Sequence, residues 1–485
     1  MESYSWVALT ALLLHWTAVI LFSARVIMRR RPVGVLLAWI ALIFSIPLLG
    51  ILLYLVVGEN RVSSVYIRRG QAIQAQYRQW KMSLSGTSSR DENAVVHAAL
   101  PVMRQAQSLV GFPAMPGGRC ELLMDYAQVF EALIEDVRAA RSSCHLEFYI
   151  WQSGGLVEEL EAALVAAAGR GVSCKVLIDA VGSKPFVKEG GPERLRRAGI
   201  EVARALPVGA FSSLFSRADL RNHRKIAIID GERAYTGSQN LVDPRLFKRD
   251  ADVGQWVDAM LRIEGPVVEA LAGTFIQDWE VVTGTRYEYF RGWDDLKSVA
   301  ASGDVVTQVV TSGPQPRPLA ILQLVLSTIY AARRELIITT PYFVPDESII
   351  TALMSVAHSG VEVTLVLPEK NDSLLVELAG RAVFDDLLEA GVIIMGFRGG
   401  LLHTKSITVD GEFCLFGSVN MDMRSLWLNF ELSLLLYSTG VTGEIRALQL
   451  EYVRQSIELD AAQFARRSVV KRFAENAVHL LAPIL

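Results

Sequence analysis

The stretch HRKIAIIDGERAYTGSQN, residues 223–240, decides the fold, because HTKSITVDGEFCLFGSVN repeats its pattern at residues 403–420. In both copies one residue separates a histidine from a lysine, four residues lead to an aspartate, and six more lead to Gly-Ser-x-Asn. The shared positions are His223, Lys225, Asp230, Gly237, Ser238 and Asn240 in the first copy, and His403, Lys405, Asp410, Gly417, Ser418 and Asn420 in the second. Matched spacing at this many positions indicates a duplicated functional unit.

The residues around each copy predict the same order of elements. Short apolar runs suit buried strands, and leucine and alanine at helical spacing lie between them. The predicted elements are strands 144–151 and 174–180 around a helix at 156–169, and strands 336–343 and 361–367 around a helix at 348–358. We therefore expect an α/β protein with two similar domains, each a sheet flanked by helices.

The paired histidines and lysines predict an anion site. Residues i and i+2 of a strand share a face, so His223 and Lys225 point together, as do His403 and Lys405. Serine and asparagine at the end of each motif add neutral hydrogen-bond donors. These are Ser238, Asn240, Ser418 and Asn420. If the two halves face one another, all these groups converge on one oxyanion.

Asp230 and Asp410 complete the motif and join the candidate catalytic set with two roles open. A carboxylate at this position could act as an acid, or it could anchor a turn before Gly231 and Gly411. The glycine that directly follows each aspartate indicates a turn, which favours the anchoring role.

Each imidazole also needs a partner that fixes its tautomer. The candidates are Asp252 and Glu431, which follow their own histidines by 29 and 28 residues at the start of another apolar strand. The alternative for both is an ordinary carboxylate at a strand edge.

The two motifs resemble those of the phospholipase D superfamily, and the whole chain is similar to bacterial cardiolipin synthases. The resemblance implies an α/β fold with two phospholipase D-like αβα sandwich domains related by pseudo-twofold symmetry. It implies a phosphatidyltransferase that works without a metal or another cofactor.

The same resemblance implies a role for each motif residue. His223 is the nucleophile that forms a phosphohistidine, and His403 is the general acid and base. The oxygens of the phosphate are held by Lys225, Lys405, Asn240 and Asn420. The donor and the acceptor are both phosphatidylglycerol, and glycerol leaves. A membrane-bound phospholipase D or a phosphatidylserine synthase-like phosphatidyltransferase would use the same residues with another acceptor, and that alternative stays open.

Two uncharged stretches near the amino terminus predict a transmembrane hairpin. Residues 5–22 and 33–57 would reach about 27 and 37 Å as helices, against a hydrocarbon core of about 30 Å. Pro47 lies inside the second stretch and could kink it. Arginines on both sides of that stretch leave the orientation open. We expect a multi-pass protein of the bacterial cytoplasmic (inner) membrane.

The predicted domain boundaries follow from these features. They are a transmembrane hairpin at 1–58, a juxtamembrane linker and helix at 59–110, a first phospholipase D-like domain at 111–290, and a second at 291–485 that ends in an amphipathic tail. Phe211, Leu214 and Phe215 form either an apolar lip that dips into lipid or part of the interdomain core. The tail is either an interfacial helix or an ordinary terminal helix.

Composition narrows the function classes. A length of 485 residues exceeds one ordinary core, and 51% hydrophobic with 20% charged residues excludes a disordered chain. The net charge is −3, but residues 1–85 carry +7, which leaves −10 for the rest and disfavours nucleic acid as a partner. The four scattered cysteines predict buried thiols. A homo-oligomer remains open.

Overall fold

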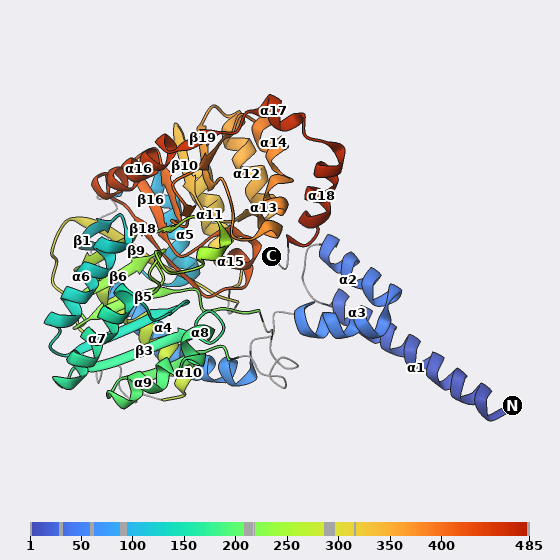
Figure 1. The fold of residues 1–485 in the computed structure, drawn as a ribbon, viewed down its shortest axis with the longest axis horizontal. Coiled ribbons are helices and arrows are strands. Elements are labelled where there is room, and N and C mark those ends of the chain that lie inside the picture. Colours follow the sequence, from blue (N-terminus) through green and yellow to red (C-terminus); the bar gives the residue numbers. More distant parts are fainter. Residues whose placement is uncertain are drawn as a thin grey trace. The chain divides into compact units, whose positions relative to one another are not determined.

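The computed structural model describes residues 2–28, 33–58, 63–87, 95–207, 217, 219–285, 296–314 and 317–482. The chain divides into two compact units, drawn in Figure 1. The first comprises Met1–Ile67 and Val208–Leu220, and the second comprises Arg68–Pro207 and Arg221–Leu485. The predicted lip residues Phe211, Leu214 and Phe215 lie outside the described residues.

The first unit holds the helices of the predicted hairpin. They are α1 (Glu2–Ile27), α2 (Val33–Ser45), α3 (Pro47–Leu53) and a π-helical turn at Tyr54–Gly58. Val19, Val26, Ile43 and Tyr54 form a small buried cluster among them.

The predicted two-span hairpin is not supported. Ile46 leaves helical geometry with φ −140° and ψ 74°, and Pro47 opens a new helix. The second stretch is thereby divided into helices of 13 and 7 residues, and the longer one reaches only about 20 Å. Throughout the part of the chain that the structure describes, no helix combines the length and apolar character needed to cross a membrane. The prediction of a multi-pass protein loses its support with the hairpin.

A 15-stranded sheet forms the centre of the second unit. Its order is β19-β13-β12-β10-β15-β16-β18-β9-β1-β8-β6-β5-β2-β3-β4. The strands before residue 300 are β1 (Met115–Leu123), β2 (Ser143–Phe148), β3 (Ser173–Asp179), β4 (Glu201–Ala205), β5 (Lys225–Ile229), β6 (Arg233–Gly237), β7 (Trp256–Val257) and β8 (Met260–Glu264). The later strands are β9 (Val305–Ser312), β10 (Glu335–Thr339), β11 (Phe343–Val344), β12 (Glu362–Pro368), β13 (Ile393–Phe397), β14 (Leu401–Leu402), β15 (Ser406–Val409), β16 (Phe413–Gly417), β17 (Met421–Asp422), β18 (Glu431–Leu436) and β19 (Ser456–Glu458).

The strand order repeats in the two halves of this sheet. Read from the outer edge of the sheet to its centre, the first half is β4-β3-β2-β5-β6-β8-β1, and the second half, after the edge strand β19, is β13-β12-β10-β15-β16-β18-β9. The halves join where β1 pairs with β9 in antiparallel orientation. The sheet order therefore carries the duplication that the sequence predicts, while the boundary between residues 290 and 291 stays a prediction.

Helices cover both faces of the sheet, as Figure 1 shows. Along β10, Leu336 and Ile338 face one hydrophobic cluster while Ile337 faces another, as alternation in a strand requires. The helices of the first half are α6 (Tyr126–Ala139), α7 (Leu156–Gly169), α8 (Lys184–Lys188), α9 (Gly191–Arg197) and α10 (Val267–Thr283). Those of the second half are α11 (Ala320–Ala331), α12 (Glu347–His358), α13 (Leu374–Arg381), α14 (Phe384–Glu389), α15 (Met423–Trp427), α16 (Thr439–Arg454), α17 (Ala461–Ala465) and α18 (Val469–His479).

The predicted juxtamembrane segment belongs largely to this second unit. Its helices are α4 (Ser64–Thr87) and α5 (Leu100–Val110). Arg69 Nη1 donates to the carbonyl of Val282 at 2.6 Å, and Trp80 Nε1 donates to Glu269 at 3.2 Å. These bonds fasten α4 to α10.

The four cysteines carry free thiols, and the prediction that they are buried is confirmed for three of them. Cys144, Cys174 and Cys414 are buried, and Cys120 is partly exposed.

Candidate active site

Each histidine of the repeated motif is positioned by the opposite half of the body. His223 donates its backbone N–H to the carbonyl of Phe430 at 2.8 Å, and Phe430 donates to the carbonyl of Arg221 at 2.9 Å. In the other half, β14 runs parallel to β7, and the His403 N–H donates to the carbonyl of Val257 at 2.8 Å. Each motif histidine is therefore bonded to the residue that directly precedes a carboxylate of the other half. Phe430 precedes Glu431, and Val257 precedes Asp258.

Those two carboxylates hold the imidazole rings. His223 Nδ1 lies 2.9 Å from Glu431 Oε2, and His403 Nδ1 lies 2.6 Å from Asp258 Oδ1. Both carboxylates are buried. A neutral histidine that donates its Nδ1 proton to a carboxylate keeps its lone pair on Nε2. Nε2 is thus the atom of each ring that is available to a ligand.

The structure corrects the predicted carboxylate partners. Glu431 does bond a histidine, but it bonds His223 rather than His403. Asp252 bonds neither, because its side chain is 94% exposed and pairs with Lys370 at 3.2 Å. The carboxylate in the corresponding place is Asp258, two residues before β8.

The motif lysines begin the strands rather than lying within them. Lys225 is the first residue of β5, and Lys405 directly precedes β15. Lys225 Nζ donates to the carbonyl of His223 at 2.7 Å, and Lys405 Nζ donates to that of His403. Each lysine side chain therefore turns back to the backbone of its own motif histidine.

Burial and charge show that the two copies form one cluster. Burial lowers the pKa of Lys225 to about 8, and the nearby Glu431 and Asp258 carboxylates oppose this. Burial also lowers the pKa of Lys405, with the charge of Lys225 contributing in the same direction. Groups 180 residues apart in the sequence thus act on one another electrostatically.

Both imidazoles are neutral near pH 7. Burial lowers the pKa of His223 to about 4 and that of His403 to about 3, and the paired carboxylates offset only part of this. Burial alone would raise the pKa of Asp258, but His403 and Lys405 hold it below its usual value. The site therefore presents two neutral imidazoles, each backed by a buried carboxyl group, beside two buried lysines.

The serines and asparagines of the motif have different surroundings. Ser418 Oγ donates to Glu431 Oε2 at 2.6 Å, and Ser238 Oγ accepts from the N–H of Ala259 at 3.1 Å. Ser418 therefore supports the Glu431 carboxylate, and Ser238 holds the backbone of Ala259 beside Asp258, so both hydroxyl groups are already engaged within the protein. Asn240 Oδ1 accepts from Ile150 N at 3.2 Å. Its Nδ2 is buried without a hydrogen-bond partner among the described residues, so it can donate to an anion.

Asp230 and Asp410 lie away from this cluster and anchor turns. Asp230 follows the last residue of β5, at the end opposite Lys225, and accepts from the backbone of Ser142 at 2.7 Å and Ser143 at 3.0 Å. Asp410 accepts in the same way from Arg334 at 2.7 Å. Both have positive φ, 56° and 54°, as the turn requires. Their membership of the catalytic set is not supported, and the anchoring alternative fits the contacts.

The comparisons with known proteins agree with the duplicated site. Residues 133–279 and 325–449 match the family described as "Cardiolipin synthase, PLD-like domain", and residues 17–59 match "Phospholipase D-nuclease N-terminal". Cardiolipin synthase A of Pectobacterium carotovorum subsp. carotovorum (strain PC1) is 41% identical over 473 residues, which cover 97% of either chain. The chain belongs to the cardiolipin synthase family.

One further relative and one solved structure of similar fold extend this result. Cardiolipin synthase A of Yersinia pseudotuberculosis serotype IB (strain PB1/+) is 40% identical over 471 residues, 97% of either chain. The solved structure of phosphatidylserine synthase from Haemophilus influenzae Rd KW20 has a TM-score of 0.61 at 15% identity and covers 79% of this chain and 100% of its own. At that identity the likeness concerns the fold, and it agrees with the predicted phospholipase D-like architecture.

Two aromatic rings at the site of this cardiolipin synthase family member were not predicted. The ring of Tyr149 lies 4.8 Å from that of His223, and Trp256 lies 4.2 Å from His403. Lys248 Nζ lies 5.4 Å over the Trp256 ring and also bonds Asp372 at 2.7 Å. Their sequence signal is weak, since the strand register places Pro341 of the repeat at the position of Tyr149.

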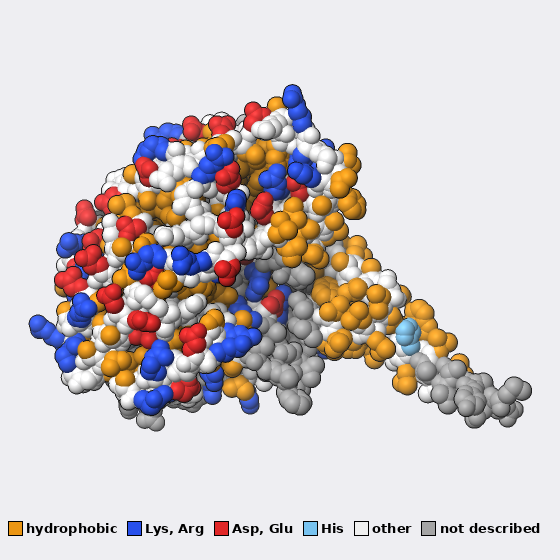
Figure 2. Space-filling view, viewed as in Figure 1, with side chains coloured by type: hydrophobic (Ala, Val, Ile, Leu, Met, Phe, Trp, Pro, Cys, Tyr) orange, Lys and Arg blue, Asp and Glu red, His pale blue; other side chains and the backbone are white. Residues whose placement is uncertain are grey.

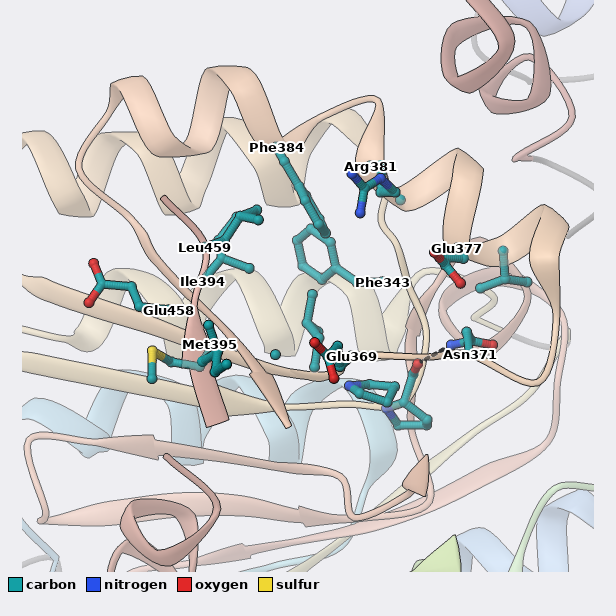
Figure 3. A pocket seen from close by; sticks show the side chains of 17 residues that line it. Phe343, Glu369, Asn371, Glu377, Arg381, Phe384, Ile394, Met395, Glu458 and Leu459 are labelled. Carbon is teal, nitrogen blue, oxygen red and sulfur yellow. Dashed lines mark hydrogen bonds between the residues drawn. The ribbon is translucent and has the colours of Figure 1, made fainter. Parts of the chain in front are cut away.

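A separate cavity of about 160 Å³ lies between α13, α14 and the ends of β12 and β13. Figure 3 shows Phe343, Phe384, Ile394 and Leu459 lining it. It contains no motif residue, but Asn371 donates to the carbonyl of Pro341 at 2.8 Å on its wall.

Proposed function

We propose that this protein is a cardiolipin synthase that transfers a phosphatidyl group from one phosphatidylglycerol to another and releases glycerol. The observation that supports it best is the crossed pairing of His223 with Glu431 and His403 with Asp258. Each half supplies the histidine of one pair and the carboxylate of the other, so a single phosphate can meet two tautomer-fixed imidazoles.

In the first step His223 Nε2 attacks the phosphorus of phosphatidylglycerol. The bond from phosphorus to the glycerol oxygen breaks. His403 takes up a proton when the phosphate anion binds beside it and gives that proton to the glycerol oxygen, so glycerol leaves as a neutral molecule. The neutral form of His223 suits this role, because its lowered pKa keeps the Nε2 lone pair available.

In the second step the glycerol hydroxyl of another phosphatidylglycerol attacks the phosphatidyl-His223 intermediate. His403 takes the hydroxyl proton, the phosphorus–nitrogen bond breaks, and cardiolipin forms with His223 restored. The net change is two phosphatidylglycerols to one cardiolipin and one glycerol. Since water would divert the intermediate to phosphatidic acid, the burial of both histidines favours transfer over hydrolysis.

The lysines and asparagines hold the non-bridging oxygens while charge develops on them. Lys225 and Lys405 are buried beside the imidazoles, where an ammonium acts more strongly than in water. Asn240 Nδ2 is a buried donor that fits the same task, and Asn420 takes the matching position in the repeat.

The substrate is a membrane lipid, so we also propose that the body works at the surface of a bacterial membrane. The two phospholipase D-like domains at 111–290 and 291–485 then share this one site. A homo-oligomer remains compatible with it.

Product analysis tests the proposal. Purified enzyme given phosphatidylglycerol alone is expected to form cardiolipin and free glycerol in equal amounts, and His223→Ala is expected to form neither. Phosphatidic acid as the main product would favour the phospholipase D alternative. If phosphatidylglycerol stays unused until serine and a nucleotide-activated lipid are supplied, the phosphatidylserine synthase alternative is favoured.

A further inference from the structure

The helix α18 exposes a stripe of apolar side chains. Val469, Val470 and Phe473 of α18 are 81%, 77% and 73% exposed, and Leu480, directly after its last residue, is 80% exposed. Their spacing places them on one side of the helix, and Figure 2 shows hydrophobic side chains gathered over the outer side of this region. Large apolar side chains concentrated in this way mark an interaction surface.

The opposite side of α18 is already packed. Glu475 is buried and accepts from Arg381 Nε at 3.1 Å and from Arg467 Nε at 2.7 Å. His479 Nδ1 lies 2.9 Å from the carbonyl of Ala379, so α13 and α18 are held together. Since this inner side is satisfied, the exposed stripe is not the unfilled face of a loosely attached helix.

The helix α13 adds to the same surface. Leu374 and Leu375 in its first turn are 67% and 47% exposed. We define the docking face as these two leucines together with the exposed apolar residues of α18 and of the two positions after it. Its members are Leu374, Leu375, Val469, Val470, Phe473, Leu480 and Leu481.

The exposed charges on α18 and just before it are positive. Arg466, Lys471 and Arg472 are exposed, with Arg472 3.8 Å from Asp385, whereas Glu475, the one acidic residue of α18, is buried. An apolar stripe bordered by cations fits an anionic bilayer surface, where the rings and alkyl groups enter the acyl boundary and the cations meet phosphate groups.

The docking face is coupled to the active site by short connections. The strand β17 directly follows the motif residue Asn420 and pairs with β11, aligning Met421 with Phe343. The helix α13 packs on β11 so closely that a Cβ at Gly380 would lie 2.5 Å from the carbonyl of Phe343. Val478 of α18 packs with Ala379 and Val344.

From these observations we propose that the docking face seats the catalytic body on an anionic lipid bilayer, so that the active site draws both phosphatidylglycerols directly from the membrane. This inference rests on the proposed function. It goes beyond that function by naming the surface that contacts lipid.

A local probe tests the contact in the full chain. We attach an environment-sensitive fluorophore to Phe473→Cys and add vesicles of phosphatidylglycerol and phosphatidylcholine, with Val165→Cys on α7, 39% exposed in the parent residue, as the matched control. The signal from Cys120 is measured on the unsubstituted protein. We expect a blue shift at position 473 and none at 165. A label that is already shifted without vesicles, or that shifts only as protein concentration rises, means that another part of the chain or a second copy covers the face, and it overturns the proposal.

Turnover separates this inference from the proposed function. Phe473→Ser with Leu480→Ser is expected to lower turnover on vesicles roughly tenfold or more, from the lost apolar burial. Turnover of dispersed short-chain phosphatidylglycerol should stay unchanged, because neither residue touches the histidines. Equal rates of variant and parent on vesicles overturn the docking face, whereas failure of the parent protein on both substrates overturns the proposed function.

Discussion

His223 and Glu431, 208 residues apart in the chain, share a hydrogen bond of 2.9 Å that joins the two halves of the body. The second pair, His403 with Asp258, repeats the arrangement in the opposite direction at 2.6 Å. Neither half can assemble a tautomer-fixed histidine without the other. The duplicated motif is therefore expected to function as one site.

The carboxylates of Glu431 and Asp258 should be needed for catalysis but not for folding. Glu431→Gln and Asp258→Asn are each expected to lower kcat by roughly 100- to 10,000-fold, because an amide can stabilise the wrong tautomer of the histidine. Turnover of phosphatidylglycerol measures the effect, and circular dichroism checks folding. Asp252→Asn, at an exposed carboxylate, is the matched control and should keep the parent rate. A folded Glu431→Gln variant with normal kcat would contradict the account.

Substrate binding should take up close to one proton between about pH 5 and 7.5. Burial lowers the pKa of His223 to about 4 and of His403 to about 3, so the empty site carries both rings neutral in this range. The first step needs His403 protonated, and the arriving phosphate anion raises its pKa. The value of kcat/KM should then fall about tenfold for each unit of rising pH.

Calorimetry with a non-transferable phosphonate analogue, in buffers of different ionisation enthalpy, measures this proton uptake. A flat kcat/KM across the range, with no proton taken up, would show that His403 does not act as the acid.

The motif lysines should contribute to the rate rather than to stability. Lys225→Met and Lys405→Met are expected to reduce kcat roughly 100- to 1,000-fold, because each removes a cation from the developing phosphate charge. Their free energy of unfolding in urea should be unchanged or higher, since a desolvated ammonium is lost. Lys370→Met, at a lysine that is 67% exposed, is the control for charge alone. Loss of stability with kcat retained would give the lysines a structural role.

The motif aspartates should behave in the opposite way. Asp230→Ala removes an acceptor for the backbone of Ser142 and Ser143, and Asp410→Ala does the same at Arg334. Each variant is expected to lose about 2–4 kcal/mol of unfolding free energy, since several charge-assisted bonds are removed. At a temperature where the variant is still folded, kcat should match the parent. A stable variant without activity would return the aspartates to the catalytic set.

The regular elements were predictable because their signal is local. The helix expected at 156–169 is α7, and the strand expected at 174–180 is β3 with a shift of one residue. The repeat spacing likewise predicted that the two motifs come together, because it is carried by the chain itself. Local periodicity and matched spacing thus sufficed for the α/β body and for the histidines and lysines of its site.

The pairing of each histidine with a carboxylate of the other half could not be predicted in this way. A count of 28 from His403 leads to Glu431, but a similar count of 29 from His223 stops at Asp252, since the first half has a longer connection that includes the 3-10 turn Arg249–Ala251. Which half supplies the partner depends on how the halves meet, and that is a tertiary property. The second apolar stretch departs from its predicted single helix for a local reason, because Pro47 divides it into two helices instead of only kinking it.

Trapping the covalent intermediate tests the central claim most directly. The His403→Ala variant is mixed with a phosphatidyl ester of p-nitrophenol, whose leaving group needs no acid. The account predicts a burst of one nitrophenolate per enzyme, a stalled second step, and the phosphatidyl group on His223 in the digested protein, with no burst in His223→Ala. A burst that survives in His223→Ala, or a phosphatidyl group on any other residue, would contradict it.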